Sequence, residues 1–165
     1  MTEGTTKAQE PKKVLFVCTA NICRSPMAEA IFNALSSDTG MPYEAKSAGV
    51  AALVGEPIAP NAVAVLEEFG VYAGEHRARQ VHEPMLEEAD LVLAMTPKHV
   101  AALQRFSAGS PEKVRTLLGY AYDTPDLEGI SDPYGQSIVT YRASARRLFE
   151  CLEVLVAQLG DQKTA

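Results

Sequence analysis

Apolar residues in this chain form short continuous runs that alternate with longer stretches of helical spacing. Continuous runs of this length are typical of strands buried on both faces of a parallel sheet. Two such runs, at residues 14–17 and 91–95, predict strands, and further short strands are expected at residues 43–48 and 114–117. Apolar residues spaced three and four apart predict helices between the runs. The expected helices lie at residues 26–39, 60–69, 83–88, 97–106 and 137–159.

Strands that alternate with helices predict an α/β fold with right-handed crossovers. We expect a single three-layer domain, in which a central four-stranded parallel sheet is flanked by helices. Ligands in such folds bind at the carboxyl ends of the strands. Cys18, which follows the first apolar run directly, stands at one of these ends.

The ends of the chain are polar, which sets the expected domain boundaries. We expect residues 1–11 to form a flexible tail, residues 12–160 to form the domain, and residues 161–165 to form a C-terminal tail. Residues 119–135 are rich in proline, glycine and acidic residues and predict a long irregular segment. Loops of that length in compact domains are usually either functional or disordered.

Composition excludes several classes of protein. Apolar residues make up 47% of the 165 positions and charged residues 22%, values that are ordinary for a globular protein. The net charge of −6 argues against a nucleic-acid surface, and no apolar run is long enough to cross a membrane. The N-terminus has no secretory signal, and three cysteines do not form a disulfide framework. We therefore expect a cytoplasmic protein that is a monomer or a weak homodimer.

The loop after the first strand combines a thiol with a guanidinium group. Cys18 and Arg24 bracket five residues, and Ser25 and Pro26 are expected to open the next helix as its N-cap and first residue. Unpaired N–H groups at a helix start bind anions, and Arg24 suits two phosphate oxygens. The positive electrostatic potential of these N–H groups and of Arg24 also favours the thiolate form of Cys18, which is a nucleophile. The alternative is a small buried cysteine beside a solvated arginine.

Several motifs together resemble the low-molecular-weight protein tyrosine phosphatase family. The loop sequence from Cys18 to Glu29 is similar to the family signature, and the other matching motifs follow in the family's order. These motifs are Ser47-Ala48-Gly49, the stretch 76–80, the stretch 89–95 and Asp132-Pro133-Tyr134. The resemblance covers nearly all of residues 12–160.

The resemblance implies a role for each residue of the site. Cys18 would be the nucleophile, Arg24 would hold the phosphate, and Asp132 would be the general acid, although Asp132 and its neighbours also favour a plain turn. The other residues expected to bind phosphate or substrate are Thr19, Ala20, Asn21, Ile22, Cys23, Ser25 and Tyr134. Asn21 would brace the loop, and Ser25 would donate to the Cys18 thiolate. Tyr134 would stack on an aromatic leaving group, or would simply be a half-buried tyrosine on a loop.

The remaining cysteines and histidines have simpler interpretations. Family members with a second loop cysteine form a reversible disulfide, so the resemblance implies redox control through Cys18 and Cys23. Cys151 is expected in the core. The histidines have no metal-ligand spacing, and none is expected to be catalytic, although His76 matches a structural histidine of the family. We expect no metal and no cofactor.

Phosphotyrosine in proteins is the expected substrate, and phosphoarginine is the main alternative. The arginine-specific branch of the family carries threonine at the position of Ile22, whereas tyrosine-specific members carry isoleucine. Thr96 replaces an aspartate found in many tyrosine-specific members, and residues 50–54 replace an aromatic cleft wall with aliphatic side chains. An arsenate reductase of the same fold would need a further pair of relay cysteines. A non-catalytic phosphate-binding module would be expected to lack Cys18 or Asp132.

Overall fold

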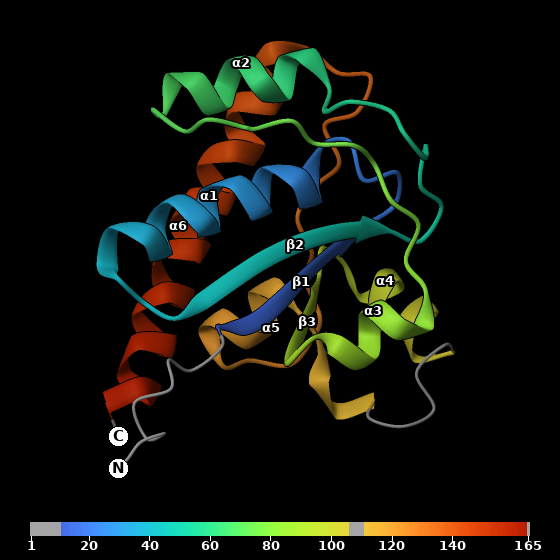
Figure 1. The fold of residues 1–165 in the computed structure, drawn as a ribbon. Helices are drawn as coiled ribbons and strands as arrows, with labels where there is room; N and C mark the ends of the chain where they lie inside the picture. Colours follow the sequence, from blue (N-terminus) through green and yellow to red (C-terminus); the bar gives the residue numbers. More distant parts are fainter. Residues whose placement is uncertain (1–10, 106–110, 165) are drawn as a thin grey trace.

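A parallel sheet of four strands forms the centre of the molecule (Figure 1). The computed structural model describes residues 11–105 and 111–164. The strands are β1 (Lys12–Cys18), β2 (Tyr43–Gly49), β3 (Leu91–Ala94) and β4 (Val114–Thr116). Their order across the sheet is β2-β1-β3-β4, and every pairing is parallel. All four expected strands and their parallel direction are therefore confirmed.

Side chains of β1 alternate between the two faces of the sheet and are buried on both. Val14 and Phe16 belong to a core cluster on one face, and Leu15 and Val17 to a second cluster on the other. The first face is covered by α1 (Arg24–Thr39), α2 (Pro60–Glu68), α5 (Leu117–Tyr122) and α6 (Ile138–Thr164). The second face is covered by α3 (Glu83–Glu88) and α4 (Pro97–Gln104). Figure 1 shows α1 and α6 on one side of the strands and α3 and α4 on the other, so the predicted three-layer α/β domain is confirmed.

The helix boundaries follow the expected signals in most places. Gly40 ends α1 in the left-handed conformation (φ 69°), where a residue without Cβ is favoured. Pro60 is the first residue of α2, as its fixed φ predicts. The apolar stripe expected for the last helix is buried, but α6 continues past Leu159 to Thr164. Phe106, expected to end α4, lies outside the described residues.

Two expectations about the elements are wrong. The first concerns the start of α1, which begins at Arg24 and has Cys23 at the N-cap position without a side-chain capping bond. Ser25 is therefore inside the first turn and does not cap the helix, and Pro26 is not its first residue. The reason is that the Ser25 hydroxyl bonds other side chains of the loop, described below.

The second concerns residues 117–122, expected to be the end of a strand and the start of an irregular segment, which form α5. Thr116 ends β4 and caps this helix, because its hydroxyl accepts a hydrogen bond of 2.9 Å from the N–H of Gly119. Asp126 in turn accepts the Thr116 hydroxyl at 3.0 Å. The helix is one to two turns long, and Gly119 weakens its pattern, which is why periodicity missed it.

The strand order places the loop after β1 at the point where the order of strand addition reverses. β1 is central, the chain first adds β2 on one side, and later adds β3 on the other. The carboxyl ends of β1 and β3 therefore diverge into loops on either side of one crevice, which is where open parallel sheets bind ligands. Within the described ranges, no helix combines the length and the apolar character that a membrane span requires.

Candidate active site

The loop between β1 and α1 curls around a cavity of about 300 Å³. Cys18 is the last residue of β1 and is only 2% exposed. Among residues 11–105 and 111–164, no hydrogen-bond acceptor is found for the backbone N–H groups of residues 19–25. These groups belong to the loop and to the first turn of α1. Unpaired N–H groups in this position form a site for an anion.

Asn21 holds the loop in its curved path. It is fully buried and adopts a left-handed backbone conformation (φ 63°), which asparagine tolerates better than most residues. Its amide donates to Ser25 Oγ at 2.7 Å and to Ser47 Oγ at 3.0 Å, and its Oδ1 accepts the N–H of Arg79 at 2.8 Å. The backbone carbonyl of Asn21 lies 2.7 Å from His76 Nε2. The bracing contacts expected of Asn21 are therefore present.

The hydroxyl of Ser25 lies 2.9 Å from the sulfur of Cys18. Because Ser25 Oγ accepts a bond from Asn21, its own proton can be donated to the sulfur. Glu29 completes the chain, since it accepts the hydroxyl of Ser47 at 2.6 Å. The Glu29 carboxylate thus orients Ser47, Ser47 orients the Asn21 amide, and that amide orients Ser25 in turn. The Ser25 hydroxyl faces the Cys18 thiol. This arrangement stabilises negative charge on Cys18.

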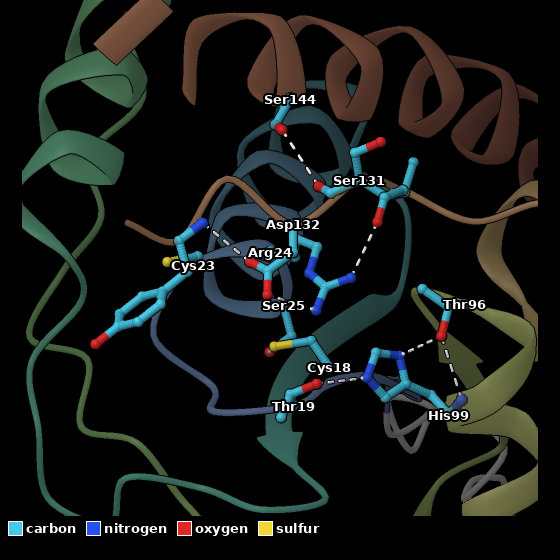
Figure 2. Close-up of polar contacts among 12 residues, drawn as sticks. Cys18, Thr19, Cys23, Arg24, Ser25, Thr96, His99, Ser131, Asp132 and Ser144 are labelled. Carbon is cyan, nitrogen blue, oxygen red and sulfur yellow. Dashed lines mark hydrogen bonds and ion pairs between the residues drawn. The ribbon is translucent and has the colours of Figure 1, made fainter. Parts of the chain in front are cut away.

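Arg24 connects the loop to the segment before α6 (Figure 2). Its side chain is 6% exposed, and Nη1 donates to the carbonyl of Ile130 at 3.0 Å. Nη2 lies 3.4 Å from Asp132 Oδ2, while Asp132 Oδ1 accepts the N–H of Tyr134 at 3.0 Å. A buried guanidinium group and a half-exposed carboxylate therefore stand on the same cavity as the Cys18 sulfur.

The mouth of the cavity is apolar. Ala51 and Leu53, from the loop after β2, line one part of it, and Tyr134 lines another. Leu53 is 45% exposed and Tyr134 is 57% exposed, so both side chains can be reached by a molecule that enters the cavity. The expected aliphatic wall is present, and Tyr134 is the aromatic side chain on the cavity.

The second loop thiol, Cys23, turns toward α6 and is also buried. Its sulfur lies 3.3 Å from the hydroxyl of Tyr141. Burial raises the pKa of the Cys23 thiol to about 11, although the bond from Tyr141 acts in the opposite direction. Burial and the contact with Cys23 also raise the pKa of Tyr141. At neutral pH both groups are therefore protonated.

Comparisons with known proteins agree with this geometry. Residues 13–165 match the family model described as low molecular weight phosphotyrosine protein phosphatase. A protein-arginine-phosphatase from Bacillus subtilis is 38% identical over 150 residues, which cover 91% of this chain and 98% of the relative.

A low molecular weight protein-tyrosine-phosphatase from Streptomyces coelicolor is 40% identical over 128 residues, covering 74% of this chain and 77% of the relative. The crystal structure of a low molecular weight protein tyrosine phosphatase from T. tengcongensis matches with a TM-score of 0.83 and 42% identity, covering 89% of this chain and 99% of that one.

The chain belongs to the low-molecular-weight protein tyrosine phosphatase family. Members of this family are hydrolases that act on phosphorylated proteins. The recognition of the family from the loop and from the Asp132-Pro133-Tyr134 motif is therefore confirmed.

The structure brings almost every expected site residue of this phosphatase to one cavity. Ser25 stands behind the cavity, in contact with the Cys18 sulfur. The expected residues that line the cavity are Cys18, Thr19, Ala20, Asn21, Ile22, Cys23, Arg24, Asp132 and Tyr134. Cys151 lies in the core, as expected, with its thiol fully buried. Among the residues described, no group of three or more His, Cys, Asp or Glu side chains is arranged to hold a metal ion.

Sequence reasoning did not foresee the residues that support the loop from behind. Ser47 and Arg79 belong to motifs that the family resemblance singled out, but it gave them no role. Ile130, whose carbonyl binds Arg24, has no signal in the sequence, because any residue can supply a backbone carbonyl. His99 was expected not to be catalytic and was given no other role, and it contacts Thr19 of the loop (Figure 2).

Proposed function

We propose that this protein is a cysteine-dependent phosphatase that hydrolyses phosphotyrosine in proteins through a phosphocysteine intermediate. One observation carries the proposal. The Cys18 sulfur, the Arg24 guanidinium and the Asp132 carboxylate all stand on one cavity, whose floor is a loop of unpaired N–H groups. A nucleophile, an anion site and an acid in one place are the parts that phosphoester cleavage requires.

In the first step, the Cys18 thiolate attacks phosphorus and the ester bond to the substrate oxygen breaks. The N–H groups of the loop and Arg24 hold the three equatorial oxygens as their charge rises. Asp132, in its protonated form, gives its proton to the leaving oxygen, which departs as a neutral phenol. The Ser25 hydroxyl, 2.9 Å from the sulfur, stabilises the thiolate before the attack.

In the second step, water hydrolyses phosphocysteine. Asp132 is now a carboxylate and takes a proton from the attacking water, whose oxygen forms the new bond to phosphorus. The bond from sulfur to phosphorus breaks, and Cys18 leaves as a thiolate that Ser25 again stabilises. Inorganic phosphate is released, and both Cys18 and Asp132 return to their starting protonation states.

Phosphotyrosine suits the walls of the cavity. Tyr134, Leu53 and Ala51 form an apolar mouth that a phenyl ring can contact. Ile22 lines the cavity from the loop, is only 7% exposed, and belongs to the apolar core cluster. An isoleucine presents no hydroxyl that could bind a guanidinium group. Tyrosine-specific members of the family carry isoleucine at this position.

Phosphoarginine in proteins is the second candidate substrate. The observation in its favour is the protein-arginine-phosphatase of Bacillus subtilis, which is 38% identical and matches over 98% of its length. An arsenate reductase is not supported, because relay chemistry needs an accessible further thiol. Cys151 is fully buried in α6, and burial raises the pKa of its thiol to about 12.

The reaction class is tested with p-nitrophenyl phosphate in the presence of EDTA. We expect turnover by the unmodified protein and none by Cys18→Ser, because serine is a much weaker nucleophile at neutral pH. Arg24→Lys is the matched variant for phosphate binding, since it keeps the positive charge but loses the paired N–H donors that bind two phosphate oxygens at once. Turnover by Cys18→Ser equal to that of the unmodified protein would refute the mechanism.

The substrate is tested with peptides that carry phosphotyrosine or phosphoarginine in the same sequence. We expect a higher kcat/KM for the phosphotyrosine peptide, and Ile22→Thr should shift the ratio toward phosphoarginine. Ile22→Val is the matched control, because it shortens the side chain without adding a hydroxyl. A preference of the unmodified protein for phosphoarginine would replace the first candidate with the second.

We also propose that Cys18 and Cys23 form a reversible disulfide under oxidation. Peroxide would oxidise the Cys18 thiolate to a sulfenic acid and release hydroxide. The Cys23 thiolate would then attack this sulfur, form the disulfide and expel a second hydroxide. Both residues belong to one loop and line the same cavity, which supports the proposal, although Cys23 must first leave its contact with Tyr141.

Conditions that keep thiols reduced suit this chemistry, and the three cysteines are free thiols in the structure. We propose a cytoplasmic protein that works as a monomer or a weak homodimer. Light scattering across a concentration series measures the oligomeric state, and a tight, concentration-independent oligomer would contradict the proposal.

A further inference from the structure

The residue after the nucleophile is held from two sides. The Thr19 hydroxyl lies 2.8 Å from Nε2 of His99, on α4. The Thr19 carbonyl accepts the N–H of Ala51 at 2.9 Å, from the loop after β2. Because threonine is branched at Cβ and therefore stiff, fixing its hydroxyl and its carbonyl fixes the orientation of the whole residue.

The ring of His99 is itself held at both nitrogens. Nδ1 lies 2.9 Å from the Thr96 hydroxyl, and Thr96 also accepts the backbone N–H of His99 as the N-cap of α4. The side chain of His99 is buried, and Figure 2 shows its ring between the two threonines. The two contacts therefore connect Thr96, which lies after β3 and caps α4, to the loop that follows β1.

A neutral imidazole matches the two hydroxyls. Burial lowers the pKa of His99 to about 4; the charge of Arg24 acts in the same direction, and the charge of Asp132 opposes it. At neutral pH one ring nitrogen therefore donates and the other accepts. One threonine hydroxyl must accept and the other donate, so both nitrogens are satisfied without a charge.

His99 is not among the residues that line the cavity. Its contact is with Thr19, the first residue of the loop that lines the cavity and whose N–H groups find no acceptor among the described residues. We propose that His99 is a positioning residue that, through the Thr19 hydroxyl, orients the first peptide groups of the phosphate-binding loop. This inference rests on the proposed phosphatase function of that loop.

The physical reason is the small tolerance of transition-state binding. Donors stabilise developing charge only if they point at it before the reaction, and misplacement by about 1 Å costs on the order of 100-fold in rate. A loop that is free to rotate at Thr19 would still bind phosphate with its remaining groups. We therefore expect loss of the contact to lower kcat more than it raises KM.

A matched pair of variants separates the two ring nitrogens. The amide nitrogen of His99→Gln reaches the position of Nε2 and retains the bond to Thr19, whereas that of His99→Asn reaches the position of Nδ1 and retains only the bond to Thr96. Thr19→Val removes the hydroxyl from the other partner at nearly constant shape. Kinetics with p-nitrophenyl phosphate and inhibition by vanadate and phosphate are measured for each variant.

We expect His99→Asn and Thr19→Val each to lower kcat by about 10-fold to 100-fold, and His99→Gln to stay within about threefold of the unmodified protein. The double variant of His99→Asn and Thr19→Val should lose no more than either single variant, because both remove one contact. Inhibition by vanadate, which resembles the transition state, should weaken more than inhibition by phosphate.

Equal loss in His99→Gln and His99→Asn, additive losses in the double variant, or an unchanged Thr19→Val would overturn the positioning role. If His99→Asn does not fold, Thr19→Val decides the question alone, since Thr19 lies on the surface. Failure of the proposed function would look different, because the unmodified protein itself would then show no turnover that depends on Cys18.

Discussion

Asp132 Oδ2 lies 3.4 Å from Arg24 Nη2, so the proposed acid and the proposed phosphate ligand form an ion pair on the active-site cavity. Arg24 is buried and Asp132 is half-exposed. An anion that binds Arg24 must compete with the carboxylate for the guanidinium group and also approaches that negative charge. The two residues therefore act on phosphate in opposite directions, and a single substitution can separate their effects.

Asp132→Asn should lower kcat and strengthen phosphate binding at the same time. Loss of the proton donor is expected to cost about 100-fold or more in kcat for phosphotyrosine. Loss of the carboxylate frees Arg24, so inorganic phosphate should become a tighter competitive inhibitor. Initial rates at several phosphate concentrations measure both quantities. Weaker inhibition by phosphate in this variant would contradict the competition for Arg24.

The same variant gives a control through the leaving group. Nitrophenol is a better leaving group than the tyrosine phenol, whose pKa is about 10, and needs less help from an acid. The loss of kcat in Asp132→Asn should therefore be smaller for p-nitrophenyl phosphate than for phosphotyrosine. Equal losses on both substrates would indicate that Asp132 acts only through the position of Arg24.

Capture of oxidised Cys18 by Cys23 should depend on pH. Burial raises the pKa of Cys23 to about 11, so its reactive thiolate is scarce at neutral pH and grows about tenfold per pH unit below that value. After peroxide treatment, the ratio of disulfide to sulfinic acid at Cys18 should rise between pH 7 and pH 9. Mass spectrometry of alkylated protein measures this ratio, and Cys23→Ser should give no disulfide at either pH.

Gly49 should tolerate no side chain, in contrast to Gly160. A Cβ at Gly49 would collide with the carbonyl oxygen of Thr19 and lie 3.1 Å from the Cβ of Asn21, so Gly49→Ala should distort the phosphate loop and reduce turnover. A Cβ at Gly160 in α6 meets only Met41 Sδ, at 3.7 Å. Gly160→Ala should therefore leave turnover unchanged and raise the free energy of unfolding by about 0.5–1 kcal/mol. Urea denaturation and turnover of the two variants test the contrast.

The free energy of unfolding should fall as the pH drops from about 6.5 toward 4. Burial lowers the pKa of His99 from 6.5 to about 4 in the folded protein, so in this range the unfolded chain binds a proton that the folded chain does not. Proton uptake then favours unfolding. In His99→Gln the decline should be shallower, and urea denaturation between pH 5 and pH 7 measures the difference. An identical slope in both proteins would contradict a neutral buried His99.

Local patterns in the sequence predicted the frame of this protein. The apolar run that ends at Cys18 predicted a strand buried on both faces, and the stripe from Tyr141 to Leu159 predicted the buried face of the last helix. Such features depend on contiguous residues, because strand and helix periods repeat within a few positions. The motif from Cys18 to Arg24 indicated an anion site for the same reason: its nucleophile, its N–H groups and its arginine are neighbours in the chain.

Tertiary packing decided which distant groups complete that site. Arg24 and Ile130 are 106 positions apart, and Thr19 and His99 are 80 apart, yet each pair is joined by one hydrogen bond. Packing also decided between the two roles expected for Ser25, since its hydroxyl contacts Cys18 and Asn21 and does not cap the helix. Contacts of this kind depend on how layers of the fold meet, and no periodicity along the chain encodes them. The sequence therefore determined the nucleophilic loop and, through the family resemblance, its candidate acid Asp132, whereas the three-dimensional arrangement of β3, α4 and the segment before α6 determined the supports of the loop.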